Sequence, residues 1–178
     1  MTTPKLLGIS GSLRKDATNT RLLRAASHLF GDNMFTLADL NFPLYDGDNE
    51  AATGVPAVVQ TLADQIAGAD AVIISTPEYN KGPSGVLKNA LDWVSRTNGN
   101  PWNGKPVAVM SAAAGRAGGE RAQMILRGFM VPFRPHILQG PEIHLADSSN
   151  QFDEAGNLTG EVYAQDLATL MTSLRAAI

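Results

Sequence analysis

The sequence predicts an α/β fold in which helices cover both faces of a parallel β-sheet. Short aliphatic runs alternate with longer segments of helical periodicity along the chain. The run 71–75 is apolar throughout, as expected for a strand whose two faces are both covered. Polar, glycine-rich segments follow the first, third and fourth runs. Together these observations favour a sheet with its functional loops along one edge.

Five strands and five helices can be assigned in order from these patterns. We expect strands at 6–9, 34–40, 71–75, 106–110 and within 137–145, the last interrupted near Gly140-Pro141. Helices are expected where apolar residues recur at helical spacing, at 22–30, 55–66, 86–94, 120–129 and 167–178. The acidic segment 41–54, with its proline and glycines, is interpreted as an exposed loop.

The composition is that of one ordinary globular domain spanning residues 1–178. Apolar residues make up 44% of the chain and the formal net charge is −3. The basic residues are scattered, so neither nucleic acid nor an anionic membrane is expected as a partner. The N-terminus lacks a signal-peptide pattern, no apolar stretch is long enough to span a membrane, and cysteine is absent. We therefore expect a soluble cytoplasmic protein with no thiolate metal site.

The first loop, 10–20, ends in a helix whose N-terminal N–H groups favour an anion. Ser12, Thr18, Asn19 and Thr20 add hydroxyl and amide donors, and Arg14 offers a planar fork suited to phosphate oxygens. An ordinary turn capped by Thr18 or Asn19 is the alternative. The spacing matches neither a P-loop nor a dinucleotide fingerprint, and it suits a terminal monophosphate better than a pyrophosphate.

The third and fourth loops are suited to a flat ligand. Loop 76–85 holds two prolines, two glycines and Tyr79, so its stiff backbone can present polar groups to the edge of a heterocycle. Loop 111–119 is built of small residues that let a planar ring approach the backbone. The alternatives are a helix that starts normally at Pro83 and a plain glycine-rich connection.

Three of these segments resemble the NADPH-dependent FMN reductase family, which includes bacterial quinone, chromate and azo reductases. The stretch LGISGSLRK at 7–15, with Asn19, is similar to the family's phosphate loop. The stretches TPEYN at 76–80 and GVLKNALDW at 85–93 are similar to its flavin-ring loop and the helix that follows. The resemblance runs from about residue 5 to 119 and is strongest to the quinone, chromate and ferric reductase subgroup. It implies a flavodoxin-like three-layer sandwich with strand order 2-1-3-4-5, non-covalent FMN, and homodimers or homotetramers.

The resemblance also implies roles for individual residues. Phosphate contacts are expected from Ser12, Arg14, Asn19 and Thr20, and contacts to the flavin ring from Pro77, Glu78, Tyr79, Asn80, Ser111 and Gly115. Relatives usually carry a serine where this chain has Ala17, so one hydroxyl contact is lost, with Thr18 as a candidate replacement. The ending Gly82-Pro83-Ser84-Gly85 also departs from the more usual Ser-x-Pro-Gly.

The activity implied is transfer of a hydride from NADH or NADPH through FMN to small acceptors by a ping-pong mechanism. The acceptors would be quinones, chromate, azo compounds or chelated ferric iron. No side chain is expected to act as a general acid or base, because the flavin carries the chemistry. Lys81 and Arg96 are candidates for contacts to the phosphates of the substrate nucleotide. Arg96, near a helix C-terminus, could equally interact with the helix dipole or lie in an interface. His28, His136 and His144 are interpreted as structural or solvated.

Three other functions stay open from the sequence. A flavodoxin-type electron carrier would dock on partner proteins, although such carriers tend to be more acidic than −3. A module that only senses FMN would bind flavin without turnover. A nicotinamide dehydrogenase without flavin is disfavoured by the missing dinucleotide fingerprint.

Overall fold

The structure is a computed structural model that describes residues 2–178 and contains one parallel sheet. Its strands follow the order β2-β1-β3-β4-β5, and β6 also pairs with β4. All pairs in this sheet are parallel. The strands are β1 (Lys5–Ser10), β2 (Met34–Leu37), β3 (Ala71–Thr76), β4 (Pro106–Ala112), β5 (His136–Ile137) and β6 (Ile143–Leu145). The predicted order 2-1-3-4-5 is confirmed.

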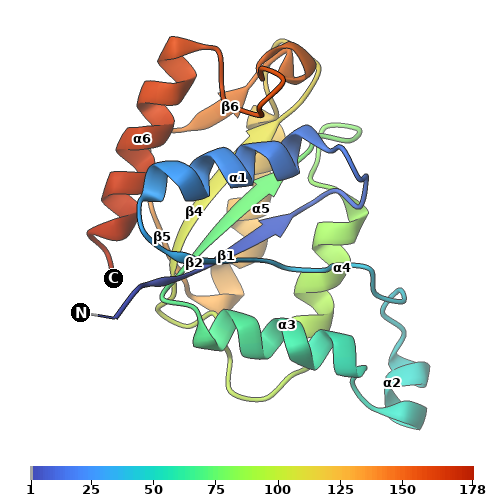
Figure 1. Cartoon of the computed structure of the whole chain (residues 1–178). Coiled ribbons are helices and arrows are strands. Elements are labelled where there is room, and N and C mark those ends of the chain that lie inside the picture. Colours follow the sequence, from blue (N-terminus) through green and yellow to red (C-terminus); the bar gives the residue numbers. More distant parts are fainter. Residues whose placement is uncertain (1) are drawn as a thin grey trace.

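Helices cover the sheet on both faces, as Figure 1 shows. Helices α1 (Thr18–Phe30) and α6 (Glu161–Arg175) pack on one face, and α3 (Ala57–Gly68), α4 (Gly85–Val94) and α5 (Glu120–Met130) pack on the other. The start of β1 and the end of α6 lie on the same side of the molecule in Figure 1. No helix in the described part of the chain combines the length and the apolar character that a membrane crossing requires.

Each central strand contributes to both cores, because successive side chains point to opposite faces. In β3, Val72 and Ile74 belong to the cluster under α3, α4 and α5, whereas Ile73 packs toward α1 and α6. The same alternation runs along β4, where Val109 and Met110 face opposite cores. Burial on both faces explains why these runs are apolar throughout.

One loop of the sequence prediction is wrong. The segment 41–54 is not a continuous loop, because Gly47–Thr53 form a short helix, α2. The Asp46 carboxylate caps it by accepting hydrogen bonds from the N–H groups of Asp48 and Asn49 at 2.9 and 3.5 Å. No residue of α2 is buried, so apolar periodicity could not reveal it. The last strand is split into β5 and β6, as the sequence suggested near Gly140-Pro141.

The segment before α2 is fastened to α4 by side chains that the sequence left unassigned. Asn89 accepts a hydrogen bond from the Tyr45 N–H at 2.9 Å and donates one to the Pro43 carbonyl at 3.0 Å. The Trp93 indole also donates to the Pro43 carbonyl, at 2.8 Å, and meets the Tyr45 ring edge-on at 5.0 Å. These contacts hold an otherwise exposed segment against α4.

Candidate functional site

A cleft of about 870 Å³ opens beyond the carboxyl ends of β1, β3 and β4. This is the edge where ligands bind in open α/β sheets. The cleft is lined by residues of the loop after β1, the loop after β3, the loop after β4 and a later segment: Ser12, Arg14, Ala17–Asn19, Pro77–Tyr79, Lys81, 112–121, Ser148 and Ser149. Three of these four segments are the loops that the sequence singled out.

The N-terminus of α1 faces this cleft without a side-chain cap. Its cap residue is Ala17, whose carbonyl accepts hydrogen bonds from the N–H groups of Thr20 and Arg21 at 3.0 and 3.1 Å. Among residues 2–178, no group accepts a hydrogen bond from the N–H of Thr18 or Asn19. Capping by the side chain of Thr18 or Asn19, the alternative raised above, is therefore not what the structure contains. Two free N–H groups and the helix dipole are available to an anion.

The Asn19 side chain is almost fully buried and ties α1 to two strands. Its amide nitrogen donates to the Ala112 carbonyl at 2.9 Å, and its amide oxygen accepts from the Ser75 hydroxyl at 2.7 Å and the Ala112 N–H at 3.1 Å. Thr20 also points inward, donating to the Ser10 hydroxyl at 2.9 Å. Thr20 does not line the cleft, whereas Ser12, Arg14, Thr18 and Asn19 do.

The loop after β3 is a tight turn that projects an aromatic ring. Tyr79 and Gly82 exchange backbone hydrogen bonds at 2.9 and 3.1 Å, with Asn80 and Lys81 between them at φ of 51° and 70°. The Tyr79 side chain is 52% exposed and lines the cleft, as does Lys81. Asn80 lies at the tip of the turn and is not among the lining residues.

This loop packs against the first loop at Gly11. The Ser84 hydroxyl caps α4 by accepting from the Leu87 N–H at 3.2 Å, and it donates to the Gly11 carbonyl at 2.5 Å. A Cβ atom added at Gly11 would lie 2.9 Å from the Pro77 ring, so only glycine permits this approach. The first and third loops are thus held at fixed separation beside the cleft.

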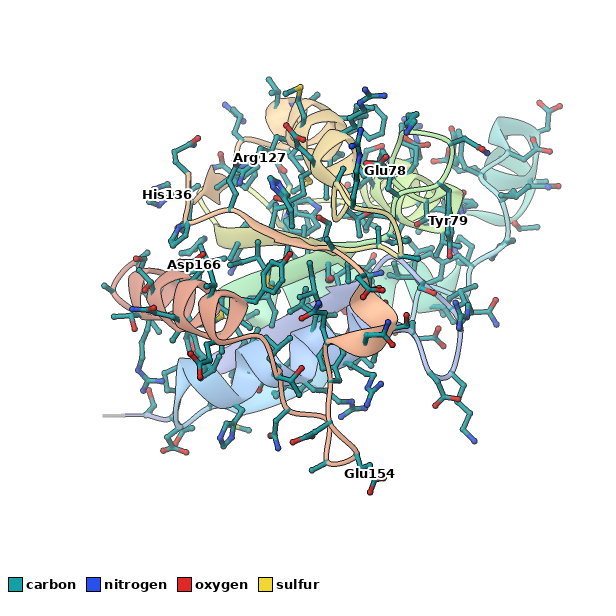
Figure 2. All side chains as sticks on the ribbon, turned by 90° about the horizontal axis from the view of Figure 1, so that it is seen from above. Glu78, Tyr79, Arg127, His136, Glu154 and Asp166 are labelled. Atoms are coloured by element: carbon teal, nitrogen blue, oxygen red, sulfur yellow. The ribbon has the colours of Figure 1, made fainter. Side chains whose placement is uncertain are left out.

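Glu78 joins the same loop to α5. Its carboxylate accepts a hydrogen bond from the Ala122 N–H at 3.3 Å, at a helix whose own cap residue, Gly119, has no side chain. In Figure 2, Glu78 lies beside α5, and His136 lies on the other side of that helix. Glu78 also lines the cleft, so it combines a structural contact with a place in the site.

The loop after β4 is shaped from beneath by buried polar groups. Ser111 is fully buried and donates to the Gly118 carbonyl at 2.6 Å. Gln123 donates to the Ser111 hydroxyl at 2.9 Å and to the Ile143 carbonyl at 2.7 Å. Ser111 therefore supports the loop and does not line the cleft, whereas Gly115 does. Open space surrounds the position of an added Cβ at Gly115, so its backbone is accessible to a flat ring.

The cleft carries more positive than negative charge. Its lining includes Arg14, Lys81, Arg116 and Arg121 against two glutamates, in a chain whose net charge is −3. None of these four cations forms an ion pair within residues 2–178. Such a local excess attracts anionic ligands.

The other predicted cation, Arg96, is placed elsewhere. It follows the C-terminus of α4, about 15 Å along the helix from the loop after β3. Its guanidinium donates to both carboxylate oxygens of Glu50 at 2.9 Å, so it is already paired. Within one copy of the chain, Arg96 does not line the cleft.

Among the charged and hydroxyl-bearing residues of the lining, sequence reasoning missed five: Arg116, Glu120, Arg121, Ser148 and Ser149. The two arginines were visible as the cationic residues in and beside the fourth loop. The two serines follow the last strand, in the short 3₁₀ helix η2 (Ser148–Asn150), and no local pattern marks that segment as part of the site.

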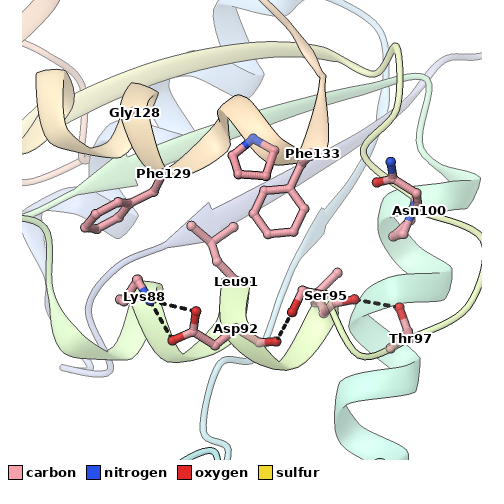
Figure 3. A pocket seen from close by; sticks show the side chains of 12 residues that line it. Lys88, Leu91, Asp92, Ser95, Thr97, Asn100, Gly128, Phe129 and Phe133 are labelled. Carbon is pink, nitrogen blue, oxygen red and sulfur yellow. Dashed lines mark hydrogen bonds and ion pairs between the residues drawn. The ribbon is translucent and has the colours of Figure 1, made fainter.

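A second cavity of about 580 Å³ lies between the C-terminal ends of α4 and α5. Figure 3 shows Phe129, Phe133 and Leu91 around it, with the Lys88–Asp92 ion pair at its edge. That ion pair spans 2.7 Å and leaves Lys88 already neutralised. The cavity therefore lacks the free anion-binding groups of the first cleft.

The donor set of the first cleft fits FMN. Free N–H groups, the Ser12 and Thr18 hydroxyls and Arg14 surround a place for a terminal phosphate. The loops holding Pro77–Tyr79 and Gly115 leave a gap between them where a flat ring system would lie.

The chain is similar in sequence to a family of known flavin-dependent reductases. A family model described as NADPH-dependent FMN reductase matches residues 4–149. An NAD(P)H-dependent FMN reductase of Pseudomonas aeruginosa is 42% identical, with 96% of this chain and 95% of the relative aligned. A quinone reductase of Escherichia coli is 38% identical, with 90% of this chain and 86% of the relative aligned.

A solved structure gives the same result for the fold. The flavoenzyme NAD(P)H:(acceptor) oxidoreductase of Paracoccus denitrificans superimposes with a TM-score of 0.87 and 32% identity. The match covers 98% of this chain and 96% of that one. The sheet, the helices and the edge that carries the cleft are therefore shared over nearly the whole length.

Proposed function

This chain belongs to the NADPH-dependent FMN reductase family, and we propose that it binds FMN in the cleft and passes electrons from NADH or NADPH to small acceptors. The observation that carries the proposal is the uncapped N-terminus of α1, which faces the cleft beside Ser12, Arg14 and Thr18. A helix terminus with free N–H groups is suited to a phosphate. The family match supports FMN as the bearer of that phosphate.

The binding residues are proposed by segment. Ser12, Arg14, Thr18 and the backbone N–H of Asn19 would hold the phosphate. Pro77, Glu78, Tyr79 and Gly115 would lie along the ring, with Asn80 at the tip of the same turn. Thr20 and Ser111 would not contact FMN. They would orient the loops through their hydrogen bonds to the Ser10 hydroxyl and the Gly118 carbonyl.

FMN supplies the redox chemistry when it is bound, by accepting a hydride from the nicotinamide and releasing two electrons to an acceptor. The chain's own residues would position FMN and the substrates in the cleft. With a quinone, each turnover oxidises one NAD(P)H and gives one hydroquinone, which requires one further proton. Water can supply that proton at the open cleft, so we propose no catalytic acid or base.

Quinones are the acceptors with most support, because a relative at 38% identity is named a quinone reductase. Chromate, azo compounds and chelated ferric iron are proposed as further acceptors, since an open cleft over a flavin does not select strongly. We propose that the nucleotide and the acceptor use the same place in turn, as in a ping-pong mechanism. Parallel lines in double-reciprocal plots at several quinone concentrations would be expected.

Lys81 is proposed as a contact for the phosphates of the nicotinamide nucleotide. It lines the cleft and has no ion-pair partner in the described chain. Arg96 was the second candidate from the sequence, but its pairing with Glu50 at the far end of α4 gives it no such support. Lys81→Gln should raise the KM for NADPH severalfold, and Arg96→Gln serves as the comparison.

We also propose that the protein is a homodimer or homotetramer located in the cytoplasm. We propose the exposed side chains of Met124 and Val131, seven residues apart along α5 and its extension, as part of the contact with a second copy. Light scattering after size exclusion would give the number of copies, and cell fractionation the location.

The experiment that tests the function is an anaerobic absorbance titration of the purified protein. We expect a flavin spectrum that bleaches on adding NADH or NADPH and returns on adding a quinone. A bound flavin that neither nucleotide reduces would favour an electron carrier or an FMN sensor. A protein that takes up no FMN would refute the proposal.

A further inference from the structure

The wall of the cleft beside α1 is completed by a segment from far along the chain. The hydroxyl oxygens of Thr18 and Ser148 are 3.0 Å apart, and both residues line the cleft. Ser148 is only 4% exposed, and its N–H donates to the Ala113 carbonyl at 3.2 Å. The first residue of α1 thus meets a hydroxyl that the rest of the fold holds in place.

Further contacts hold this segment on the first turns of α1. The Arg21 guanidinium donates to the Asp153 carbonyl at 3.1 Å and lies 4.8 Å from the centre of the Phe152 ring. Just before Ser148, the carboxylate of Asp147 accepts from the Asn150 side chain at 3.1 Å. The first contact ties the segment after Ser148 to α1, and the second closes the turn around Ser148.

A pair of hydroxyl groups at this place leaves one hydrogen free. Each hydroxyl carries one hydrogen, and one of the two is used between Thr18 and Ser148. If Ser148 donates to Thr18, the Thr18 hydrogen is free to point at an anion beside the N–H groups of Thr18 and Asn19. Ala17, the cap residue, offers no hydroxyl of its own.

We propose that Ser148 is a positioning residue of the FMN phosphate subsite, which orients the Thr18 hydroxyl as a donor to the phosphate. This inference rests on the proposed function, because it assumes that FMN occupies the cleft. It assigns a binding role to the segment after the last strand, outside the three loops on which the site was built. Thr18 would touch the phosphate, and Ser148 would act through Thr18.

The test measures the affinity of the apoprotein for FMN and for riboflavin, which lacks the phosphate, by fluorescence quenching. Ser148→Ala should weaken FMN binding about fivefold to tenfold and leave riboflavin binding unchanged. Thr18→Val should weaken FMN binding at least as much, and the double variant should add little to it. Ser173→Ala, on the exposed face of α6, is the matched control and should change neither affinity.

A rescue variant separates a phosphate contact from a structural role. Ala17→Ser in the Ser148→Ala background places a new hydroxyl at the same helix terminus and should restore part of the FMN affinity. Melting curves of all apoproteins report on folding independently of flavin.

Three outcomes are distinguishable. A loss confined to FMN supports the proposal. Equal losses for FMN and riboflavin, or no loss for either, overturn it while leaving the proposed function intact. If the unmodified protein binds neither flavin, the proposed function fails first and this inference fails with it.

Discussion

The Glu78 carboxylate accepts a hydrogen bond from the Ala122 N–H across 3.3 Å, and this bond joins a loop that lines the cleft to helix α5. Ala122 lies in the first turn of α5, where N–H groups have no partner within the helix. Glu78 therefore acts as a cap supplied by a different loop. The contact holds the loop after β3 against the start of α5.

Glu78→Ala should destabilise the apoprotein by about 1 kcal/mol, the usual cost of removing a helix cap. Glu78→Gln keeps an acceptor oxygen and should therefore lose less stability than Glu78→Ala. Urea unfolding of the two variants measures the difference. Equal stability of Glu78→Ala and the unmodified protein would show that the contact does not support α5.

Asn19→Ala should destabilise the apoprotein more than Glu78→Ala, because it removes three buried hydrogen bonds at once. The Ser75 hydroxyl and the Ala112 backbone would be left without partners, at a cost of about 3 kcal/mol or more. Asn49→Ala on exposed α2 is the matched control and should stay within about 0.5 kcal/mol. A small effect at Asn19 in denaturant unfolding of the apoprotein would contradict its role as a link between α1 and the sheet.

Two glycines of one loop should respond differently to alanine. At Gly118, φ is 58° and an added Cβ would lie 2.2 Å from the His144 carbonyl oxygen, so Gly118→Ala should cost about 2–3 kcal/mol. At Gly115 nothing blocks the added carbon, so Gly115→Ala should keep its stability within about 1 kcal/mol.

The FMN affinity of the Gly115→Ala variant tests where the flavin ring lies. If the ring approaches the Gly115 backbone, Gly115→Ala should weaken FMN binding although the fold is intact. Fluorescence titration checks this, and unchanged affinity would place the ring elsewhere in the cleft.

The pairing of Glu50 with Arg96 predicts a dependence of stability on pH. The Arg96 guanidinium, hydrogen-bonded to the Glu50 carboxylate, holds the pKa of Glu50 below its ordinary value. A group whose pKa is lower in the folded state stabilises fully above its unfolded pKa, about 4.3, and loses this contribution as the pH falls through the folded value. Glu50→Gln should therefore lower the melting temperature at pH 7 and have less effect at pH 3. If the difference in melting temperature between Glu50→Gln and the unmodified protein grew as the pH fell, the lowered pKa of Glu50 would be contradicted.

The sheet could be predicted well because its signals are local and strong. The apolar run at β3 and the glycine-rich loops after β1 and β4 mark the strands and their functional edge directly. Helix α2 was missed because it buries no side chain, and its only signal is the Asp46 cap.

The candidate site was predictable only in part, for a similar reason. Ser12, Arg14 and Tyr79 lie on polar, glycine-rich loops whose composition indicates ligand binding, and the structure brings them to one cleft. The inward turn of Thr20 and Ser111 depends on partners such as Ser10 and Gly118, which local sequence does not reveal. Ser148 enters from 130 residues beyond Thr18, and only the packed fold brings the two together.

The termini have a practical consequence. The start of β1 and the end of α6 lie on one side of the molecule, and the cleft opens at the opposite edge of the sheet, where the strands end. The end of α6 is secured there by Arg175, which donates to the Phe30 and Asp32 carbonyls at 3.0 and 2.8 Å. An affinity tag, a fused partner protein or a tether to an electrode can therefore be attached at either end while the cleft stays directed toward the solution.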